Sequence, residues 1–135
     1  MSVREPLIRV EDLHVWFALP EGRELHAVQG VTFELNEGER LGLVGESGCG
    51  KTTTILAMMG LLPASASVSG KVILGGEDIL ARGEDSISPH RWTDISMVFQ
   101  GAMNAFNPVK TIGAQIAEPM EHHGCDSARF MSFSV

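Results

Sequence analysis

The segment that most constrains the fold of this chain is a glycine-rich loop with the spacing Gly-x-x-x-x-Gly-Lys-Thr. It reads Gly45-Glu46-Ser47-Gly48-Cys49-Gly50-Lys51-Thr52. The glycines permit backbone angles that other residues avoid, and they let the main chain approach a ligand closely. Such a loop points successive N–H groups inward, and a following helix adds the positive end of its dipole. The segment therefore predicts a cradle for phosphate groups.

Three side chains at the end of this loop have separate expected roles. Lys51 is expected to place a point charge near the β- and γ-phosphates of a nucleotide, with ATP the expected nucleotide. The Thr52 hydroxyl is expected to ligate Mg²⁺, and Thr53 to reach an α-phosphate oxygen. Cys49 is expected to be a small residue that fits the loop, reduced like Cys125, rather than a redox group.

The flanking sequence predicts a strand before the loop and a helix after it. Leu41 to Val44 is a short run interrupted only by Gly42, and continuous apolarity favours a buried strand of a parallel sheet. After the loop, apolar residues recur at i, i+3, i+4 and i+7, which indicates one face of a helix; they are Ile55, Met58, Met59 and Leu62. Gly60 weakens the end of this helix, and Pro63 stops it.

Alternating apolar and polar residues predict an antiparallel pair of strands ahead of the loop. The pair comprises Ile8–Phe17, with a bulge near Asp12, and Val31–Leu35. Residues 36–39 are predicted to form a turn. Further along, the predicted elements are strands at Gly70–Leu74 and Ile95–Phe99, and a short helix at Thr111–Ala117 that ends before Pro119.

Composition limits the classes of partner. The chain has 135 residues, 44% of them hydrophobic, and a net charge of −7. These values are typical of a globular domain, and the acidic balance argues against a nucleic-acid partner. The longest apolar run falls far short of the roughly 20 residues that span a bilayer, so membrane association is expected only through a partner.

Beyond the loop, the order of features resembles the ATP-binding subunits of ABC transporters, and within them the oligopeptide/dipeptide importer branch. The resemblance runs from about Leu7 to Gly124. The segments that carry it are residues 13–22, 27–33, 45–54, 98–108 (Val-Phe-Gln-Gly-Ala-Met-Asn-Ala-Phe-Asn-Pro) and 112–119. Their order and spacing together are more specific than any one of them, the loop excepted.

The resemblance implies an α/β fold of the ABC-type P-loop NTPase class with an N-terminal antiparallel β subdomain. It implies that Phe17 stacks on adenine, although such a residue is more often an ordinary strand residue. It implies that Gln100 contacts Mg²⁺ and the attacking water. The implied partners are membrane permease subunits, a second ATP-binding subunit and, indirectly, a periplasmic or extracellular solute-binding protein. The implied location is the cytoplasmic face of the membrane.

Several family motifs are missing after Gln100: the Leu-Ser-Gly-Gly signature, the Walker B strand and the switch histidine. Residues 1–135 therefore resemble the N-terminal part of a nucleotide-binding domain with an incomplete core. Residues 125–135 diverge from the family and are expected to form a divergent or disordered tail. We hypothesise a truncated or frameshifted product that binds nucleotide with little or no turnover, because no carboxylate to polarise water is recognisable.

Other hypotheses about the function remain open at this point. The chain is alternatively a non-catalytic nucleotide-binding remnant, or the ATPase subunit of a nickel or other small-solute importer. A small kinase is disfavoured by the antiparallel pair and by Val98-Phe99-Gln100. A DNA-repair ATPase is disfavoured by the acidic charge. The pair His122-His123 is expected to lie in a solvated loop rather than in a metal site.

Overall fold

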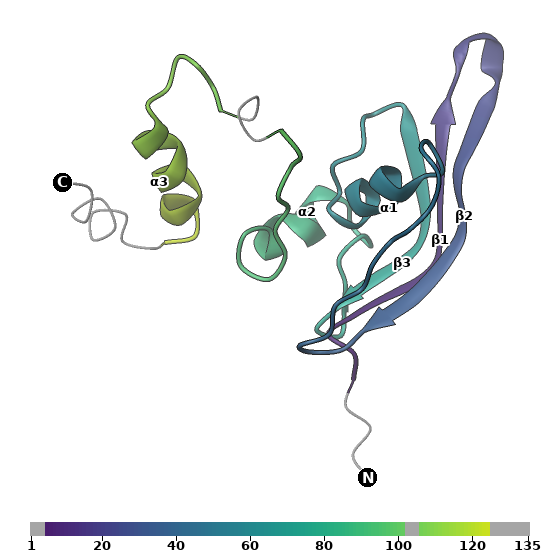
Figure 1. Ribbon diagram of the computed structural model, residues 1–135, viewed down its shortest axis with the longest axis horizontal. Helices are drawn as coiled ribbons and strands as arrows, with labels where there is room; N and C mark the ends of the chain where they lie inside the picture. Colours follow the sequence, from purple (N-terminus) through teal and green to yellow (C-terminus); the bar gives the residue numbers. More distant parts are fainter. Residues whose placement is uncertain (1–4, 102–105, 125–135) are drawn as a thin grey trace. The chain divides into compact units, whose positions relative to one another are not determined.

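The computed structural model describes residues 5–101 and 106–124 (Figure 1). The chain divides into two compact units, residues 1–91 and 92–135, and each is described by itself. The predicted tail at residues 125–135 lies outside the described residues. Within the described part of the chain, no helix has the length and apolar character needed to cross a bilayer.

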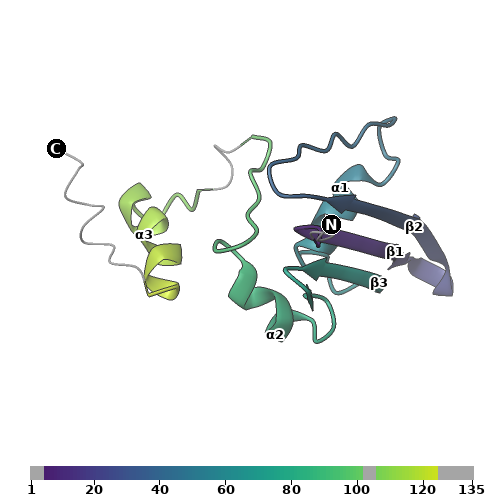
Figure 2. The same ribbon diagram turned by 90° about the horizontal axis from the view of Figure 1, so that it is seen from below.

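The first unit is built on a four-stranded antiparallel sheet with the order β2-β1-β3-β4. Figure 2 shows β1 lying between β2 and β3. The strands are β1 (Ile8–Ala18), β2 (Glu24–Leu35), β3 (Ala66–Leu74) and β4 (Glu77–Asp78). A short 3-10 turn, η1 (Pro20–Gly22), joins β1 to β2. The predicted antiparallel pair is confirmed, and β2 begins seven residues earlier than predicted, at Glu24 rather than Val31.

The predicted bulge in β1 is confirmed at Asp12. This residue has a φ of 46°, and the pairing register of β1 shifts between Val10 and Leu13. The backbone N–H of Asp12 donates to Thr32 Oγ1 at 2.9 Å, because the bulge removes it from the regular ladder. Gly70 of β3 lies directly against the bulge, where a Cβ would stand 2.4 Å from the Asp12 carbonyl oxygen.

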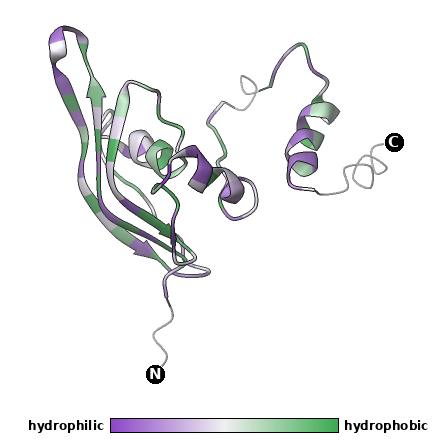
Figure 3. Cartoon of the chain, turned by 180° about the vertical axis from the view of Figure 1, so that it is seen from behind, coloured by the Kyte–Doolittle hydropathy of each residue, from purple (hydrophilic) through white to green (hydrophobic). Residues whose placement is uncertain are grey.

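One face of the sheet forms the core of the first unit. Helix α1 (Lys51–Met58) packs against β1 and β2, and the short helices α2 (Glu84–Ile87) and η2 (Ser88–His90) follow β4. Polar and apolar bands alternate along the strands, as Figure 3 shows. The buried apolar side chains include Val10, Leu13, Val15, Val28, Ala57, Met59, Val72, Leu74, Ile79 and Ile87.

The prediction of a buried strand at Leu41–Val44 is wrong. These residues belong to no strand, and Leu41, Leu43 and Val44 are 50%, 39% and 95% exposed. A parallel strand needs a neighbour to satisfy its N–H and C=O groups. The described sheet is entirely antiparallel and has no strand beside this segment.

The predicted helix after the loop forms, and its buried face is only partly the predicted one. Thr54, Ala57 and Met59 face the core, whereas Ile55 is 37% exposed. The helix ends as predicted near Gly60, whose φ of 62° is left-handed. There Leu61 N–H donates to the Leu56 carbonyl at 2.8 Å, so the terminus closes in a Schellman arrangement.

Three predictions in the second unit are also wrong. Ile95–Phe99 does not form a strand, and Val98 is 93% exposed. Helix α3 (Ile112–His122) runs through Pro119 instead of stopping before it, and it includes His122, which was expected in a loop. Thr111 caps this helix by accepting from the Ala114 N–H at 3.3 Å. Lys110 pairs with Glu118 at 3.0 Å, which ties the preceding turn to the helix around the proline.

Candidate phosphate-binding site

The glycine-rich loop leads directly into α1. Gly50 is the N-cap residue, with a φ of 93° in the left-handed region. The first main-chain bond of the helix joins Thr54 N–H to the Gly50 carbonyl at 2.8 Å, and Thr54 Oγ1 donates to the same oxygen at 2.9 Å. The N–H groups of Lys51, Thr52 and Thr53 precede this bond and so have no partner within the helix. The end of α1 therefore presents donors suited to an anion.

Strand β2 supports the loop at Gly50. A Cβ on Gly50 would lie 2.6 Å from the Ala27 carbonyl oxygen and 3.5 Å from a Val28 methyl group. Gly45 is restricted by the loop itself, because a Cβ there would lie 2.6 Å from Cys49 Sγ. Gly48 has a φ of 80° and open space around it. The glycines thus serve different needs: close contact at Gly45 and Gly50, and backbone conformation at Gly48 and Gly50.

The Lys51 ammonium folds back onto the loop. Its Nζ donates to the carbonyl oxygens of Gly45 and Glu46 at 2.7 and 2.6 Å, and lies 3.4 Å from Cys49 Sγ. The charged group is therefore held beside the N-terminus of α1, where it and the helix dipole both favour negative charge. Cys49 is an exposed free thiol.

These residues fit the phosphates of a nucleotide. An ammonium, the three leading N–H groups of an eight-residue helix and two threonine hydroxyls belong to one continuous segment, Lys51 to Thr53, next to the exposed loop. The described residues contain no group of three or more side chains that would hold a metal ion by themselves. That is compatible with Mg²⁺, which is usually held by few protein groups together with substrate phosphates.

Phe17 and Gln100 lie in different units. Phe17 is half-buried in β1, opposite Leu25 and Ala66, and by strand alternation it shares the face of Leu13 and Val15. Gln100 is an exposed turn residue of the second unit. The roles of both in nucleotide binding remain predictions.

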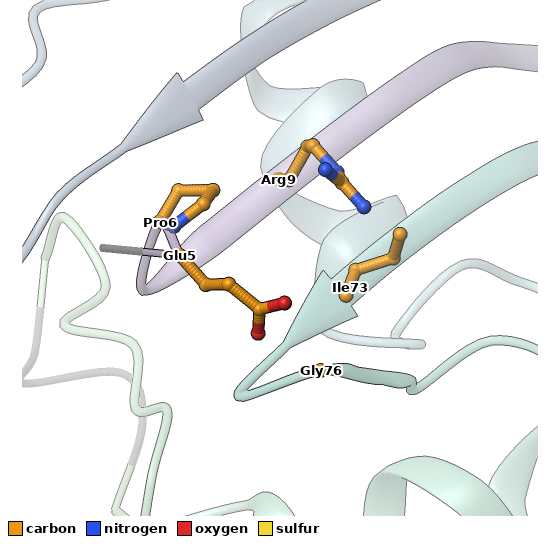
Figure 4. A pocket seen from close by; sticks show the side chains of 5 residues that line it. All are labelled: Glu5, Pro6, Arg9, Ile73 and Gly76. Carbon is orange, nitrogen blue, oxygen red and sulfur yellow. The ribbon is translucent and has the colours of Figure 1, made fainter. Parts of the chain in front are cut away.

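A small pocket of the first unit lies apart from the loop residues. Its volume is about 130 Å³, and it is lined by Glu5, Pro6, Arg9, Ile73 and Gly76, as Figure 4 shows. Drug-sized ligands occupy pockets of roughly 300 Å³ or more. This pocket is therefore too small for a nucleotide. A second pocket of about 330 Å³, lined by residues that include Ala57, Gly60 and Leu80, contains none of the loop residues, so the candidate site is the open surface at the start of α1.

Comparison with known families decides the class of the protein. Residues 28–132 match the family model described as ABC transporter. The chain belongs to the ABC transporter family. The predicted resemblance is thus confirmed, as is an ABC-type P-loop fold class with an N-terminal antiparallel sheet.

Three individual relatives show which members of this family the chain is similar to. The chain is 41% identical over 130 residues to the oligopeptide transport ATP-binding protein OppD of Salmonella typhimurium, covering 96% of this chain and 38% of the relative. It is 41% identical over 121 residues to the dipeptide transport ATP-binding protein DppD of Bacillus subtilis, covering 88% and 36%. It is 44% identical over 125 residues to OppF of Salmonella typhimurium, covering 87% and 36%. The chain thus spans less than two fifths of the length of these relatives.

Two arrangements in the first unit were not predicted from sequence. Arg91 donates from Nε to the Met59 carbonyl at 3.1 Å and from Nη2 to the Gly60 carbonyl at 3.2 Å, at the far end of α1. Its guanidinium also pairs with Glu84. The other arrangement is a stack of His14, Trp16 and His26 on the sheet. Alternation marked His14 and Trp16 as one face, but nothing in the sequence fixed the pairing with His26.

Proposed function

We propose that this chain is the nucleotide-binding N-terminal part of the ATP-binding subunit of a peptide importer. The observation that carries the proposal is the Gly45–Thr52 loop, with Lys51 held beside the N-terminus of α1. The names of the relatives, oligopeptide and dipeptide transport ATP-binding proteins, favour peptides over nickel or another small solute.

In this proposal each group of the loop has a separate role in nucleotide binding. The backbone N–H groups of residues 45–52 surround the β- and γ-phosphates of ATP, and Lys51 turns from its carbonyl partners to the phosphate oxygens. Thr52 ligates Mg²⁺, and Thr53 contacts the α-phosphate. Bound Mg²⁺ supplies charge neutralisation during phosphoryl transfer. Phe17 stacks on the adenine, and Gln100 contacts Mg²⁺ and the attacking water.

The proposed partners follow from the family. They are membrane permease subunits, a second ATP-binding subunit and, indirectly, a solute-binding protein. The proposed location is the cytoplasmic face of the membrane, reached through the permease. The isolated chain is expected to bind nucleotide with little or no hydrolysis, since it contains no recognisable Walker B carboxylate.

The test is a calorimetric titration of the purified chain with Mg·ATP. Lys51→Ala is expected to weaken binding by about tenfold or more, because one charge-assisted contact to phosphate contributes roughly 1.5–3 kcal/mol. The matched control is Lys71→Ala, which removes an exposed lysine of β3 and leaves the net charge equal to that of the test variant. Equal weakening by both substitutions would show that general charge, not the loop, holds the nucleotide.

A further inference from the structure

Three aromatic rings gather on the sheet of the first unit. His14 and Trp16 lie on β1 and His26 lies on β2, where Trp16 pairs with His26 across the ladder. The Trp16 and His26 ring centroids are 4.6 Å apart, and Trp16 and His14 are 5.3 Å apart with planes inclined by only 8°. His14 and Trp16 alternate with the buried residues Leu13 and Val15, so the rings lie on the face opposite the core.

The two imidazoles are hydrogen-bonded to each other. His14 Nδ1 lies 2.9 Å from His26 Nε2, and His14 Nε2 lies 3.1 Å from Asp12 Oδ1. A carboxylate only accepts, so the Nε2 of His14 carries the proton that faces Asp12. The Nδ1 of a neutral His14 then has a free lone pair, which accepts from the Nε2–H of His26.

This arrangement has the components of a metal site. Neutral imidazole nitrogens are preferred ligands of Zn²⁺, Cu²⁺ and Ni²⁺. Two ligand nitrogens bound about 2.1 Å from one ion stand roughly 3.0–3.4 Å apart, close to the observed 2.9 Å, so binding keeps this separation and turns each ring until its lone pair points at the ion instead of at the other nitrogen. A carboxylate on the second nitrogen of a ligating histidine fixes its tautomer and increases its basicity.

We propose that His14 Nδ1 and His26 Nε2 bind a divalent transition-metal ion of the imidazole-preferring class. The ion takes the place of the proton between the rings, His26 passes to its Nδ1–H tautomer by proton exchange with solvent, Asp12 orients His14 from behind, and water completes the coordination. The bulge at Asp12 places the carboxylate for this role, since a φ of 46° turns the residue out of the regular strand. The proposal is independent of nucleotide binding.

Trp16 makes the proposal measurable with Ni²⁺ as the probe. Its ring stacks on both imidazoles, so a paramagnetic ion bound between them quenches its fluorescence. The experiment uses the full chain carrying Trp92→Phe, which removes the other tryptophan. Quenching is expected to saturate at a single equivalent of Ni²⁺. His14→Gln and His26→Gln are each expected to weaken it by tenfold or more, and Asp12→Asn by about tenfold.

Matched controls separate this site from other groups that bind metals. The double variant His122→Gln, His123→Gln removes two histidines that are adjacent to each other in the second unit. It is expected to leave the Ni²⁺ titration unchanged, as is Lys51→Ala. Circular dichroism checks that each variant is folded. If quenching persists in the His14→Gln, His26→Gln double variant, or is absent from the parent chain, the proposal is wrong.

A second measurement needs no variant. Ni²⁺ is expected to slow modification of His14 and His26 by diethyl pyrocarbonate in the natural chain, relative to His122 and His123, as read by peptide mass spectrometry. Equal rates with and without Ni²⁺ at His14 and His26 would overturn the assignment.

Discussion

At the scale of single residues, Gly50 is more constrained than the other glycines of the loop. It combines a φ of 93° with a Cβ position 2.6 Å from the Ala27 carbonyl oxygen. Gly48 has a similar φ of 80° but no neighbour within 4 Å. The two positions therefore separate the cost of left-handed backbone from the cost of a backbone clash.

Replacing each glycine by alanine measures these two costs. Gly48→Ala is expected to lower the free energy of unfolding by about 1 kcal/mol, the cost of a left-handed non-glycine residue. Gly50→Ala is expected to lower it by about 3 kcal/mol, because β2 and the loop must also separate. Urea denaturation compares them, and equal losses would mean that the contact with Ala27 is unimportant.

Glu39, in the turn at residues 36–39, makes the stability of the fold depend on pH. The Asn36 backbone N–H, donating to Glu39 Oε2 at 2.8 Å, and then the Asn36 side-chain amide hold the pKa of Glu39 below its ordinary value. A lowered folded-state pKa stabilises the fold above the unfolded pKa of about 4.3, and this stability is lost as the pH falls through the folded-state value.

The expected result is that Glu39→Gln lowers the urea midpoint at pH 7 but has a much smaller effect near pH 3. Glu37→Gln, in the same turn, is the matched control. A difference between Glu39→Gln and the natural chain that is as large at pH 3 as at pH 7 would show that the carboxylate charge is not the cause.

At the scale of elements, α1 is held at both ends. Gly50 and β2 fix its N-terminus, and Arg91 donates to the Met59 and Gly60 carbonyls beyond its last residue. Arg91 is also paired with Glu84, and its side chain is only 19% exposed. A cation at a helix C-terminus is favoured by the dipole, so Arg91 acts on α1 through both charge and hydrogen bonds.

Arg91→Ala is therefore expected to lower the free energy of unfolding by about 2 kcal/mol. Arg82→Ala is the control. Its guanidinium lies 3.9 Å from Glu77 with the side chain 71% exposed, and such surface pairs contribute less than about 1 kcal/mol. Thermal unfolding of the two variants compares the losses. Similar losses would contradict the idea that Arg91 anchors α1.

Much of the β1–β2 pair was predictable because its alternation is local and its bulge falls where the alternation breaks, at Asp12. The loop and the start of the helix were predictable because glycine, lysine and threonine at this fixed spacing are typical of a phosphate-binding loop that leads into a helix. The lack of a strand at Leu41–Val44 and at Ile95–Phe99 was not predictable, because a strand forms only beside a partner strand that is far away in sequence. Pro119 was misjudged as the end of the helix: α3 runs through it, with Thr111 capping the first turn and Lys110 paired with Glu118 just before the proline.

At the scale of the whole molecule, the chain spans between 19% and 40% of the length of the relatives that it matches. The described sheet is antiparallel, and the apolar residues Leu41 and Val44 beside the loop are exposed. Phosphate binding and hydrolysis have different requirements. Holding phosphates needs only the loop and α1, whereas hydrolysis also needs a carboxylate and an oriented water molecule.

The expected outcome is that the purified chain releases no phosphate from Mg·ATP above the rate of the Lys51→Ala variant. A coupled phosphate-release assay checks this. Steady turnover that disappears in Lys51→Ala would show that the chain contains a complete catalytic set.

The most direct test of the phosphate loop is a comparison of ATP, ADP and AMP binding by calorimetry, each with Mg²⁺. If Lys51 and the N-terminus of α1 hold the β- and γ-phosphates, ATP and ADP bind, and AMP binds more weakly by a factor on the order of a hundred. Lys51→Ala should reduce that preference. Equal binding of all three nucleotides, unchanged in Lys51→Ala, would contradict the account.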